Sequence, residues 1–349
     1  PTLRRLGVSN GLTAALAEAG MPAAVFYRVN NDPTIRNVED ALACYRENRC
    51  DAIIAFGGGS PMDCAKLCGA RVARPEKTVA QMKGTLKIRR TLPPLYAVPT
   101  TSGTGSEATL AAMVSGKDHR KFMVGDLELI PRAAVLDPSL TRGMPPALTA
   151  ASGMDALTHA VEAYIGNNNT AATRAHAEAA VRMVFTDLER AYQNGEDREA
   201  RKTMQQAAYR AGLAITRANV GCAHAVAHAV GGRYGLPHGL ACGVALPVVL
   251  RAYGAKAYHP LAALADAAGL AENTPQTTAQ KAEAFIAAVE ALGRRLGLPA
   301  GFRQLEAADI PALAAQAARE GNRFYPAPKV LSEKELEAVL RKLTTPQSE

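Results

Sequence analysis

The stretch GCAHAVAHAVGGRYGLPHGLACGVALP, which runs from Gly221 to Pro247, carries three of the seven histidines of the chain. His224 and His228 are four residues apart, so on a helix their side chains project from one face. His238 follows a Gly-Gly pair and the LPHG break, which allows the chain to double back and present a third imidazole to the same point. The stretch therefore predicts part of a metal site.

The matching half of such a site lies earlier in the chain, in SGMDALTHAVEAY, where Asp155 and His159 are also four residues apart on a strongly helical segment. A carboxylate and several imidazoles from two helices and a turn can enclose a divalent cation. Any one of these histidines could be an ordinary core residue, but their combined spacing favours the metal site. HAVAH has no Glu after its first His, which excludes the metalloprotease helix.

Composition narrows the class of protein. The 349 residues predict two domains, and 48% hydrophobic with 21% charged residues is ordinary for a soluble globular protein. The net charge of +8 is scattered, without a basic tract and without Trp, so nucleic acid is not an expected partner. A small anionic ligand such as a nucleotide needs far less positive charge than this.

The six cysteines lie in apolar segments and lack the two-residue gap of a redox or zinc motif. They are expected to be reduced core residues, which predicts a cytoplasmic protein. The sequence shows neither a signal peptide nor an apolar run long enough to span a bilayer, so no membrane is expected as a partner.

Residues 1–145 alternate helical and strand-like segments and predict an α/β dinucleotide-binding domain. NGLTAALAEAG is helical, AAVFYRV (23–29) is strand-like, and TIRNVEDALACYRENRC is amphipathic with helical spacing. DAIIAF is a short continuous apolar run of the kind that a buried parallel strand shows. LYAVP, RKFMVGD and AAVLD are expected to be further strands.

Two glycine-rich loops follow the strands DAIIAF and LYAVP. In GGGSPMDCAK, Ser60 is expected to cap a helix and Pro61 to take its first position, leaving backbone N–H groups free to hold a pyrophosphate. The second loop is TTSGTGSEAT, rich in hydroxyl groups. Two such loops at the carboxyl ends of strands predict a nucleotide site, although Met62 breaks the GxGxxG pattern. Lys121 could reach a ribose or phosphate there, or it could be a solvated lysine at a strand end.

Residues 146–349 follow a pair of prolines and have a different character. They are rich in Ala, helical in period and poor in β-branched runs, so they predict an all-helical domain that carries the metal ligands. The fold class expected for the whole chain is α/β plus all-α.

Four segments, GGGSPMDCAK, PTTSGTGSEAT, GMDALTHAVEAY and AHAVAHAVGGRYGLPHG, resemble the iron-containing (group III) alcohol dehydrogenases, in their expected order and over nearly the whole chain. The resemblance implies a dehydroquinate synthase-like architecture, with a Rossmann-like N-terminal domain and a helical C-terminal domain that hold one divalent metal between them. It also implies NAD or NADP as cofactor, and Fe²⁺ or sometimes Zn²⁺ as the metal.

The same resemblance implies roles for individual residues. His228 lies beside the nicotinamide and the substrate without ligating the metal, and is expected to relay a proton. Lys121 contacts a ribose, and Asp63 lies near the nicotinamide end. The implied metal ligands are Asp155, His159, His224 and His238, and the implied phosphate and nicotinamide contacts are Gly58, Gly59, Ser60, Thr100, Thr101, Ser102 and Thr104.

The resemblance further implies that the family's first strand precedes Pro1, together with the residue that decides between NAD and NADP. A homo-oligomer, dimeric or larger, is expected. The expected activity is that of a metal-dependent alcohol dehydrogenase or aldehyde reductase acting on a short-chain primary alcohol, diol or aldehyde. The alternatives are a glycerol dehydrogenase-like enzyme with a polar substrate and, more distantly, a non-catalytic nucleotide- or metal-binding protein. The chain lacks the GxxxxGK[ST] loop of a kinase.

Overall fold

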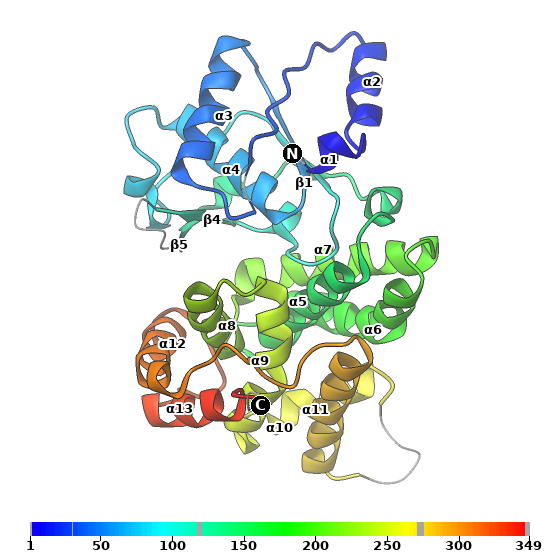
Figure 1. The fold of residues 1–349 in the computed structure, drawn as a ribbon, viewed down its shortest axis with the longest axis vertical. Helices are drawn as coiled ribbons and strands as arrows, with labels where there is room; N and C mark the ends of the chain where they lie inside the picture. The colour runs from blue at the N-terminus through cyan, green and yellow to red at the C-terminus, as the bar shows by residue number, and fades with distance from the viewer. Residues whose placement is uncertain (1, 30, 117–120, 271–275, 346–349) are drawn as a thin grey trace. The chain divides into compact units, whose positions relative to one another are not determined.

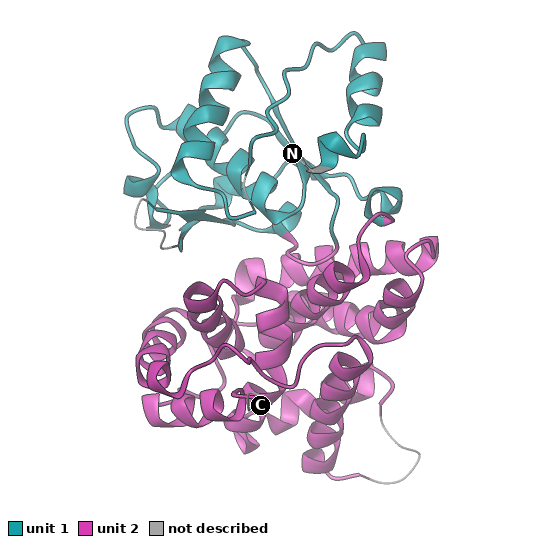
Figure 2. Ribbon diagram, viewed as in Figure 1, with its two compact units in different colours: residues 1–101, 106–141 teal, residues 102–105, 142–349 magenta. Residues whose placement is uncertain are grey.

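The computed structural model describes residues 2–29, 31–116, 121–270 and 276–345 of the chain (Figure 1). The chain divides into two compact units, which are coloured separately in Figure 2. The first contains strands and helices, and the second is built from α-helices. Unit 1 comprises residues 1–101 and 106–141, and unit 2 comprises residues 102–105 and 142–349.

Parallel and antiparallel strand pairs make the sheets of unit 1. One sheet has the order β1–β3–β6, all parallel, and the other has the order β2–β5–β4, in which β2 and β5 are parallel and β4 is antiparallel to β5. The strands are β1 (Ile53–Gly57), β2 (Gly84–Thr85), β3 (Leu95–Pro99), β4 (Ala111–Ser115), β5 (Lys121–Gly125) and β6 (Ala133–Ala134). The helices are α1 (Thr2–Arg5), α2 (Asn10–Glu18), α3 (Ile35–Glu47) and α4 (Gly59–Ala73), with 3₁₀ turns η1 (Ala80–Met82), η2 (Ser106–Ala108), η3 (Leu127–Leu129) and η4 (Pro138–Thr141).

The strands β1 and β3 bring the glycine-rich loops together. Gly57, the last residue of β1, pairs with Pro99, the last residue of β3, so both loops leave the same edge of the sheet. The amide of Thr100 donates to the carbonyl of Gly57 at 3.0 Å, which ties the start of the second loop to the start of the first. The helix α4 then packs against β1. The predicted strand–loop–helix order is confirmed here.

The prediction of a strand at residues 23–29 is wrong. These residues have no regular secondary structure, and most of their side chains are exposed, including Val25 at 49% and Tyr27 at 39%. A strand needs a neighbour to satisfy its backbone groups, and no ladder of the described residues includes this segment. The apolar run of this segment did not reveal that it pairs with no strand among the described residues.

Unit 2 is a set of packed helices around a core made largely of Ala, Val and Leu. Small alanine side chains allow the helices to approach closely, and the sequence puts them on the buried faces of α6, α7 and α12. Within the part of the chain that the structure describes, no helix is long and apolar enough to cross a membrane. The helices are α5 (Pro146–Ile165), α6 (Ala171–Gln193), α7 (Arg198–Ala218), α8 (Cys222–Tyr234), α9 (His238–Tyr253), α10 (Ala255–Ala267), α11 (Thr278–Arg295), α12 (Ile310–Phe324) and α13 (Glu333–Lys342), with the 3₁₀ turn η5 (Ala307–Asp309).

The helix α5 lies at the centre of unit 2 and is buried on all sides along residues 153–165. It contacts α6, α7, α8 and α9. A helix that is buried all round normally carries few polar groups, because each of them needs a partner away from water. The polar residues of this stretch, Asp155, Thr158, His159 and Glu162, are therefore the ones that require an explanation.

A sharp turn joins α8 to α9. The helix α8 ends at Tyr234 and is capped by Gly235, whose φ of +67° is the left-handed conformation that glycine adopts at low cost. The helix α9 begins at His238, directly after Pro237. This geometry confirms the predicted break and places His238 at the first position of its helix.

Candidate metal centre

Asp155 and His159 lie on α5, one turn apart. Both side chains are buried, at 3% and 7% exposure, and the Nε2 atom of His159 lies 3.9 Å from Oδ1 of Asp155. A carboxylate and an imidazole thus occupy the interior of a helical bundle, where unpaired charge is costly.

The helices α8 and α9 add two imidazoles to the same carboxylate. Nε2 of His224 lies 3.9 Å from Oδ1 of Asp155, and Nε2 of His238 lies 3.5 Å from it. The start of α9 can approach α5 this closely because residue 239 is glycine, since a Cβ there would lie 2.3 Å from the carbonyl oxygen of Ala151. The convergence that the sequence spacing predicts is present in the structure.

Several atoms of this cluster have no hydrogen-bond partner among the described residues. They are Oδ1 of Asp155, Nε2 of His224 and Nδ1 of His159, all of them buried. Buried polar atoms in proteins are normally paired, so the unpaired carboxylate oxygen of Asp155 facing the unpaired Nε2 of His224 calls for a further group. Oxygen and nitrogen donors of this kind fit a divalent cation such as Fe²⁺ or Zn²⁺.

The protonation states also suit a cation. Burial lowers the pKa of His224 well below its usual value, and the neighbouring His159 lowers it further. The pKa of Asp155 is lowered even though burial raises it, because His159, His238 and His224 surround the carboxylate. A neutral imidazole and an ionised carboxylate are the forms that bind metal, so no proton has to leave these groups first.

Cys242, one turn after His238 on α9, belongs to the same cluster. Its thiol sulfur lies 3.6 Å from Nε2 of His238. Donor atoms of Asp155, His224, His238 and Cys242 all lie within 4.8 Å of one another, and His159 is not a member of this group among the described residues. Burial, followed by the charges of Asp155 and Glu162, raises the pKa of the Cys242 thiol.

Glu162 orients His224 from the side away from Asp155. Its Oε2 lies 2.5 Å from Nδ1 of His224, and its carboxylate accepts the backbone amides of Gly221 at 2.8 Å and Ala223 at 2.7 Å. A carboxylate on one ring nitrogen fixes the imidazole so that the other nitrogen faces the cation. Burial raises the pKa of Glu162 to about 7, against the effect of the two amides.

His228 lies beside the cluster with a carboxylate of its own. Its ring stacks on the ring of His238 with centroids 5.1 Å apart, and its Nδ1 lies 2.6 Å from Oε1 of Glu320 on α12. The hydroxyl of Tyr325 donates to the same oxygen of Glu320. His228 and His238 are 27% and 37% exposed, whereas His224 is 3% exposed, so the cluster is open to solvent on the side of His228 and His238.

The first glycine-rich loop makes the start of α4. Gly58 is the N-cap and offers no side-chain cap to the first-turn amides of the helix. The predicted cap at Ser60 is therefore wrong, because the helix begins one residue earlier than Ser60 and the Ser60 hydroxyl donates to the carbonyl of Asn31 instead. Pro61 correspondingly lies inside the first turn rather than at its first position. Backbone amides at a helix N-terminus attract anions, so pyrophosphate binding at this loop stays a prediction.

The second loop lies against the first. A Cβ at Gly58 would lie 3.2 Å from the side chain of Thr101, so the two loops meet closely only because residue 58 is glycine. Thr100 is 4% exposed and directly follows β3. The structure thus brings Gly58, Gly59, Ser60, Thr100 and Thr101 together at one sheet edge of unit 1.

Asp63 and Lys121 have protein partners in unit 1. Asp63 accepts the hydroxyl of Ser106 at 2.9 Å and the amide of Met113 at 3.1 Å, which joins α4 to η2 and β4. Nζ of Lys121 lies 2.5 Å from Oδ1 of Asp32, and its side chain is 46% exposed. An exposed ion pair holds a lysine only weakly, so Lys121 remains free to meet a ligand.

Ser102 and Thr104 belong to unit 2, in which this part of the second loop packs against α5 and α7. A Cβ at Gly103 would lie 2.8 Å from the carbonyl oxygen of Ser152 on α5. The hydroxyl of Ser102 is buried and has no hydrogen-bond partner in the described part of the chain. This orphaned hydroxyl marks a polar position that a ligand can satisfy.

Family models cover both units of the chain. Residues 1–138 match the family described as "Iron-containing alcohol dehydrogenase", and residues 149–344 match "Fe-containing alcohol dehydrogenase family, C-terminal". The chain belongs to the iron-containing alcohol dehydrogenase family. The resemblance stated from the sequence motifs is confirmed, and so is the predicted combination of an α/β and a helical part.

Relatives within the iron-containing alcohol dehydrogenase family match most of the chain. The "1,3-propanediol dehydrogenase" of Klebsiella pneumoniae is 40% identical over 330 residues, which cover 93% of this chain and 84% of the relative. The "NAD-dependent methanol dehydrogenase" of Bacillus methanolicus is 35% identical over 305 residues, covering 87% and 79%. A crystal structure of a 1,3-propanediol oxidoreductase superposes with a TM-score of 0.94 at 38% identity, covering 98% of this chain and 90% of the other.

Four residues that contact the candidate sites or their loops, Lys66, Glu162, Cys242 and Glu320, were not predicted to have a functional role. Glu162 lies one turn beyond His159 in the quoted motif, so its spacing on α5 was a usable signal, whereas Cys242 and Glu320 are found only through tertiary contacts. Lys66 closes the first loop motif and is fully buried, and its ammonium donates to the carbonyls of Thr109 at 2.7 Å and Ala111 at 2.9 Å. Burial lowers the pKa of Lys66 to about 8.

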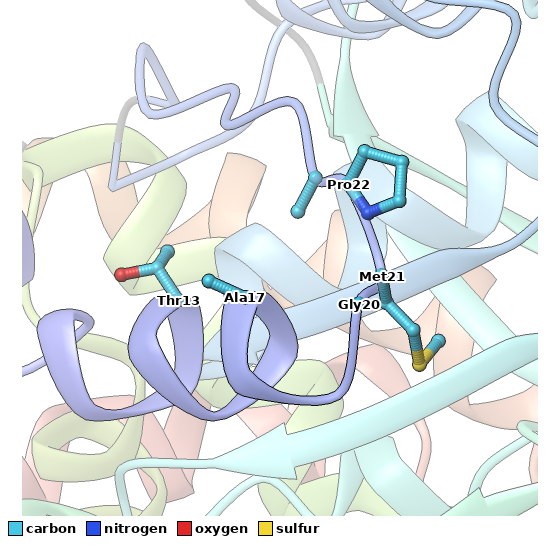
Figure 3. A pocket seen from close by; sticks show the side chains of 6 residues that line it. Thr13, Ala17, Gly20, Met21 and Pro22 are labelled. Atoms are coloured by element: carbon cyan, nitrogen blue, oxygen red, sulfur yellow. The ribbon is translucent and has the colours of Figure 1, made fainter.

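A hollow elsewhere in unit 1 carries none of these groups. Figure 3 shows the hollow, of about 310 Å³, between α2 and the segment that follows it. Its lining is small and apolar apart from one hydroxyl, and offers no acid, base or metal donor. The residues that line it are Thr13, Ala17, Gly20, Met21, Pro22 and Ala23.

Proposed function

We propose that this chain is a metal-dependent, NAD(P)-linked dehydrogenase that interconverts short primary alcohols or diols and their aldehydes. The main support for this proposal is the buried cluster in which Oδ1 of Asp155, which has no hydrogen-bond partner among the described residues, faces the Nε2 atoms of His224 and His238. Short alcohols and diols are favoured as substrates because this chain is 40% identical to a protein named for 1,3-propanediol and 35% identical to one named for methanol.

The proposed metal ligands are Asp155, His159, His224 and His238, and the proposed metal is Fe²⁺ or Zn²⁺. When bound, a divalent cation supplies Lewis-acid polarisation of a substrate oxygen, and a nicotinamide supplies the hydride acceptor. The protein contributes a preorganised donor set, since Glu162 holds the His224 ring in place through Nδ1.

The proposed dinucleotide contacts are mainly backbone and hydroxyl groups. The free amides at the start of α4, at Gly58, Gly59 and Ser60, would hold the pyrophosphate, with Thr100 and Thr101 beside them. Ser102 and Thr104 would contact the phosphates and the nicotinamide, Asp63 would lie near the nicotinamide end, and Lys121 would contact a ribose.

His228 is the proposed proton carrier. Glu320 occupies its Nδ1 at 2.6 Å, which leaves Nε2 to accept the proton of the alcohol during oxidation and to return it during reduction. His228→Ala should lower turnover and change its pH profile, while His259→Ala, at an exposed position of α10, should leave both unchanged. An unaltered pH profile with full turnover in His228→Ala would remove His228 from this role.

The function is tested by following the loss of NADH or NADPH absorbance with a panel of short aldehydes. The protein is stripped of metal and reloaded anaerobically with Fe²⁺ or with Zn²⁺. Turnover that appears only after reloading supports the proposal and gives the cofactor, metal and substrate preferences together. Stoichiometric metal binding without turnover on any short aldehyde would contradict the proposed reaction.

A cytoplasmic location and a homo-oligomeric state, dimeric or larger, are also proposed. All six cysteines are unpaired, and four of them are buried in the protein interior, which suits a reducing compartment. Light scattering on the eluted protein would measure the mass of the assembly, and a monomer would contradict the oligomer.

A further inference from the structure

The thiol of Cys242 is directed at the candidate metal centre. Cys242 is fully buried on α9, one turn after His238, and its sulfur lies 3.6 Å from Nε2 of that histidine. The sulfur is therefore within the 4.8 Å that encloses the donor atoms of Asp155, His224 and His238.

Unpaired metal-donor atoms lie beside this sulfur. Oδ1 of Asp155 and Nε2 of His224 belong to side chains that are 2% exposed, and both atoms lack a partner within the described residues. Cys222 provides a comparison, since it is equally buried in unit 2, but its sulfur packs against Gly321 of α12. A buried cysteine of unit 2 therefore need not lie at the cluster. Cys242 lies there because it follows His238 by one turn on α9.

We propose that Cys242 is a metal donor in this chain, so that the cation is bound by sulfur as well as by oxygen and nitrogen. This inference rests on the proposed metal-dependent function and adds a ligand to it. The thiol proton passes to solvent as the sulfur–metal bond forms, because the thiolate is the ligand form. A sulfur donor selects thiophilic ions such as Zn²⁺ and Co²⁺ over Mg²⁺ or Mn²⁺.

Cobalt substitution tests this assignment without relying on activity. Metal-stripped wild type, Cys242→Ser, Cys242→Ala and the matched control Cys222→Ser are each loaded with Co²⁺, and bound cobalt is measured by elemental analysis. Wild type and Cys222→Ser should show a near-ultraviolet sulfur-to-cobalt charge-transfer band, and both Cys242 variants should lack it. Zn²⁺ affinity, measured by chelator competition, should fall at least about tenfold in the Cys242 variants, the lower end of what losing an outer-shell partner costs.

The outcomes separate this inference from the function on which it rests. Stoichiometric cobalt without the band in wild type leaves the metal-dependent function standing and overturns the sulfur ligand. A band that persists in Cys242→Ser and Cys242→Ala also overturns it. Wild type that binds no cobalt at all contradicts both. Circular dichroism of the four proteins checks that each variant retains its helices, and the alanine variant remains informative if the serine variant does not.

Discussion

Side chains make the candidate site of unit 2, whereas backbone groups make the candidate site of unit 1. In unit 2, a carboxylate, several imidazoles and a thiol converge in a helical interior. In unit 1, the amides at the start of α4 face the hydroxyl-rich loop that follows β3, and glycine keeps their surroundings open. The difference suits the ligands, because a metal ion needs a few placed donors and a pyrophosphate needs several N–H groups in a row.

The two designs fail in different ways. A site made of buried side chains depends on each donor and on the helix packing that places it, so single substitutions should have large effects. A site made of backbone groups depends on the shape of a turn, and a side chain beside it contributes less.

Asp155→Asn should give the largest effect. It removes the carboxylate that the Nε2 atoms of His159, His224 and His238 approach within 3.5–3.9 Å. Loss of the bound metal should lower kcat/KM by about 10³-fold, equivalent to about 4 kcal/mol of transition-state stabilisation. Metal content and NADH oxidation are the measurements, with the exposed pair member Asp266→Asn as control. Full metal occupancy and activity in Asp155→Asn would contradict the assignment.

Lys66→Met tests a buried cation of unit 1 through pH. Burial lowers the pKa of Lys66 from 10.5 to about 8 in the folded protein, so folding disfavours its charged form. Stability should therefore decline as pH falls from about 10.5 to about 8, by about 3 kcal/mol, and stay level below that window. Lys66→Met should lack this contribution. The thermal midpoints of wild type and variant are compared across the window, where parallel curves would refute the prediction.

Exposed Lys87 offers the matched control for this measurement. Lys87→Met should follow wild type at every pH, because its side chain lies in solvent in both the folded and the unfolded chain. A Lys87→Met curve that diverges in the same way would assign the effect to net charge and not to burial.

Gly239→Ala tests the approach of α9 to α5. The added methyl would lie 2.3 Å from the carbonyl oxygen of Ala151, so α9 must move and take His238 away from Asp155. We expect a destabilisation of about 2 kcal/mol and weaker metal binding. Gly232→Ala is the control, since a Cβ there meets nothing within 4 Å and alanine favours the helix. Equal thermal midpoints and metal affinities for the two variants would contradict the packing argument.

Lys121→Gln should have the smallest effect. The ion pair with Asp32 is exposed and should contribute little stability, so the thermal midpoint should stay unchanged. If Lys121 contacts a ribose, NADH binding should weaken by about fivefold, equivalent to about 1 kcal/mol. Lys87→Gln is the control for charge. Unchanged NADH affinity would mean that Lys121 is a solvated lysine at the start of β5.

The contrast between the units also explains how much of the molecule could be predicted from the sequence. Helical spacing and a turn predicted a cluster of one carboxylate and several imidazoles, whereas only the family resemblance separated His228 from the proposed ligands Asp155, His159, His224 and His238. The strand–loop–helix order around β1 and β3 was readable from apolar runs that end in glycine. By contrast, the segment 23–29 matched a strand pattern, but pairing depends on a neighbour that local sequence does not reveal.

The partners of the site residues were harder to predict. Glu320 reaches His228 across 92 positions of sequence, and Cys242 resembles any buried cysteine until the cluster around Asp155 is seen. The sequence predicted Ser60 as the N-cap of α4, but the helix begins at Gly59, because three successive glycines allow a helix to begin at more than one residue. Tertiary packing decides these features, and no local spacing carries that information.

The contrast is tested most directly by measuring Zn²⁺ and NADH binding separately, by calorimetry, in wild type, Asp155→Asn and Gly58→Ala. A Cβ at residue 58 would crowd Thr101 at 3.2 Å and should weaken NADH binding by about tenfold. We expect a crossed result, in which Asp155→Asn loses Zn²⁺ and retains NADH while Gly58→Ala retains Zn²⁺ and binds NADH weakly. Zn²⁺ bound normally by Asp155→Asn, or NADH bound normally by Gly58→Ala, would contradict it.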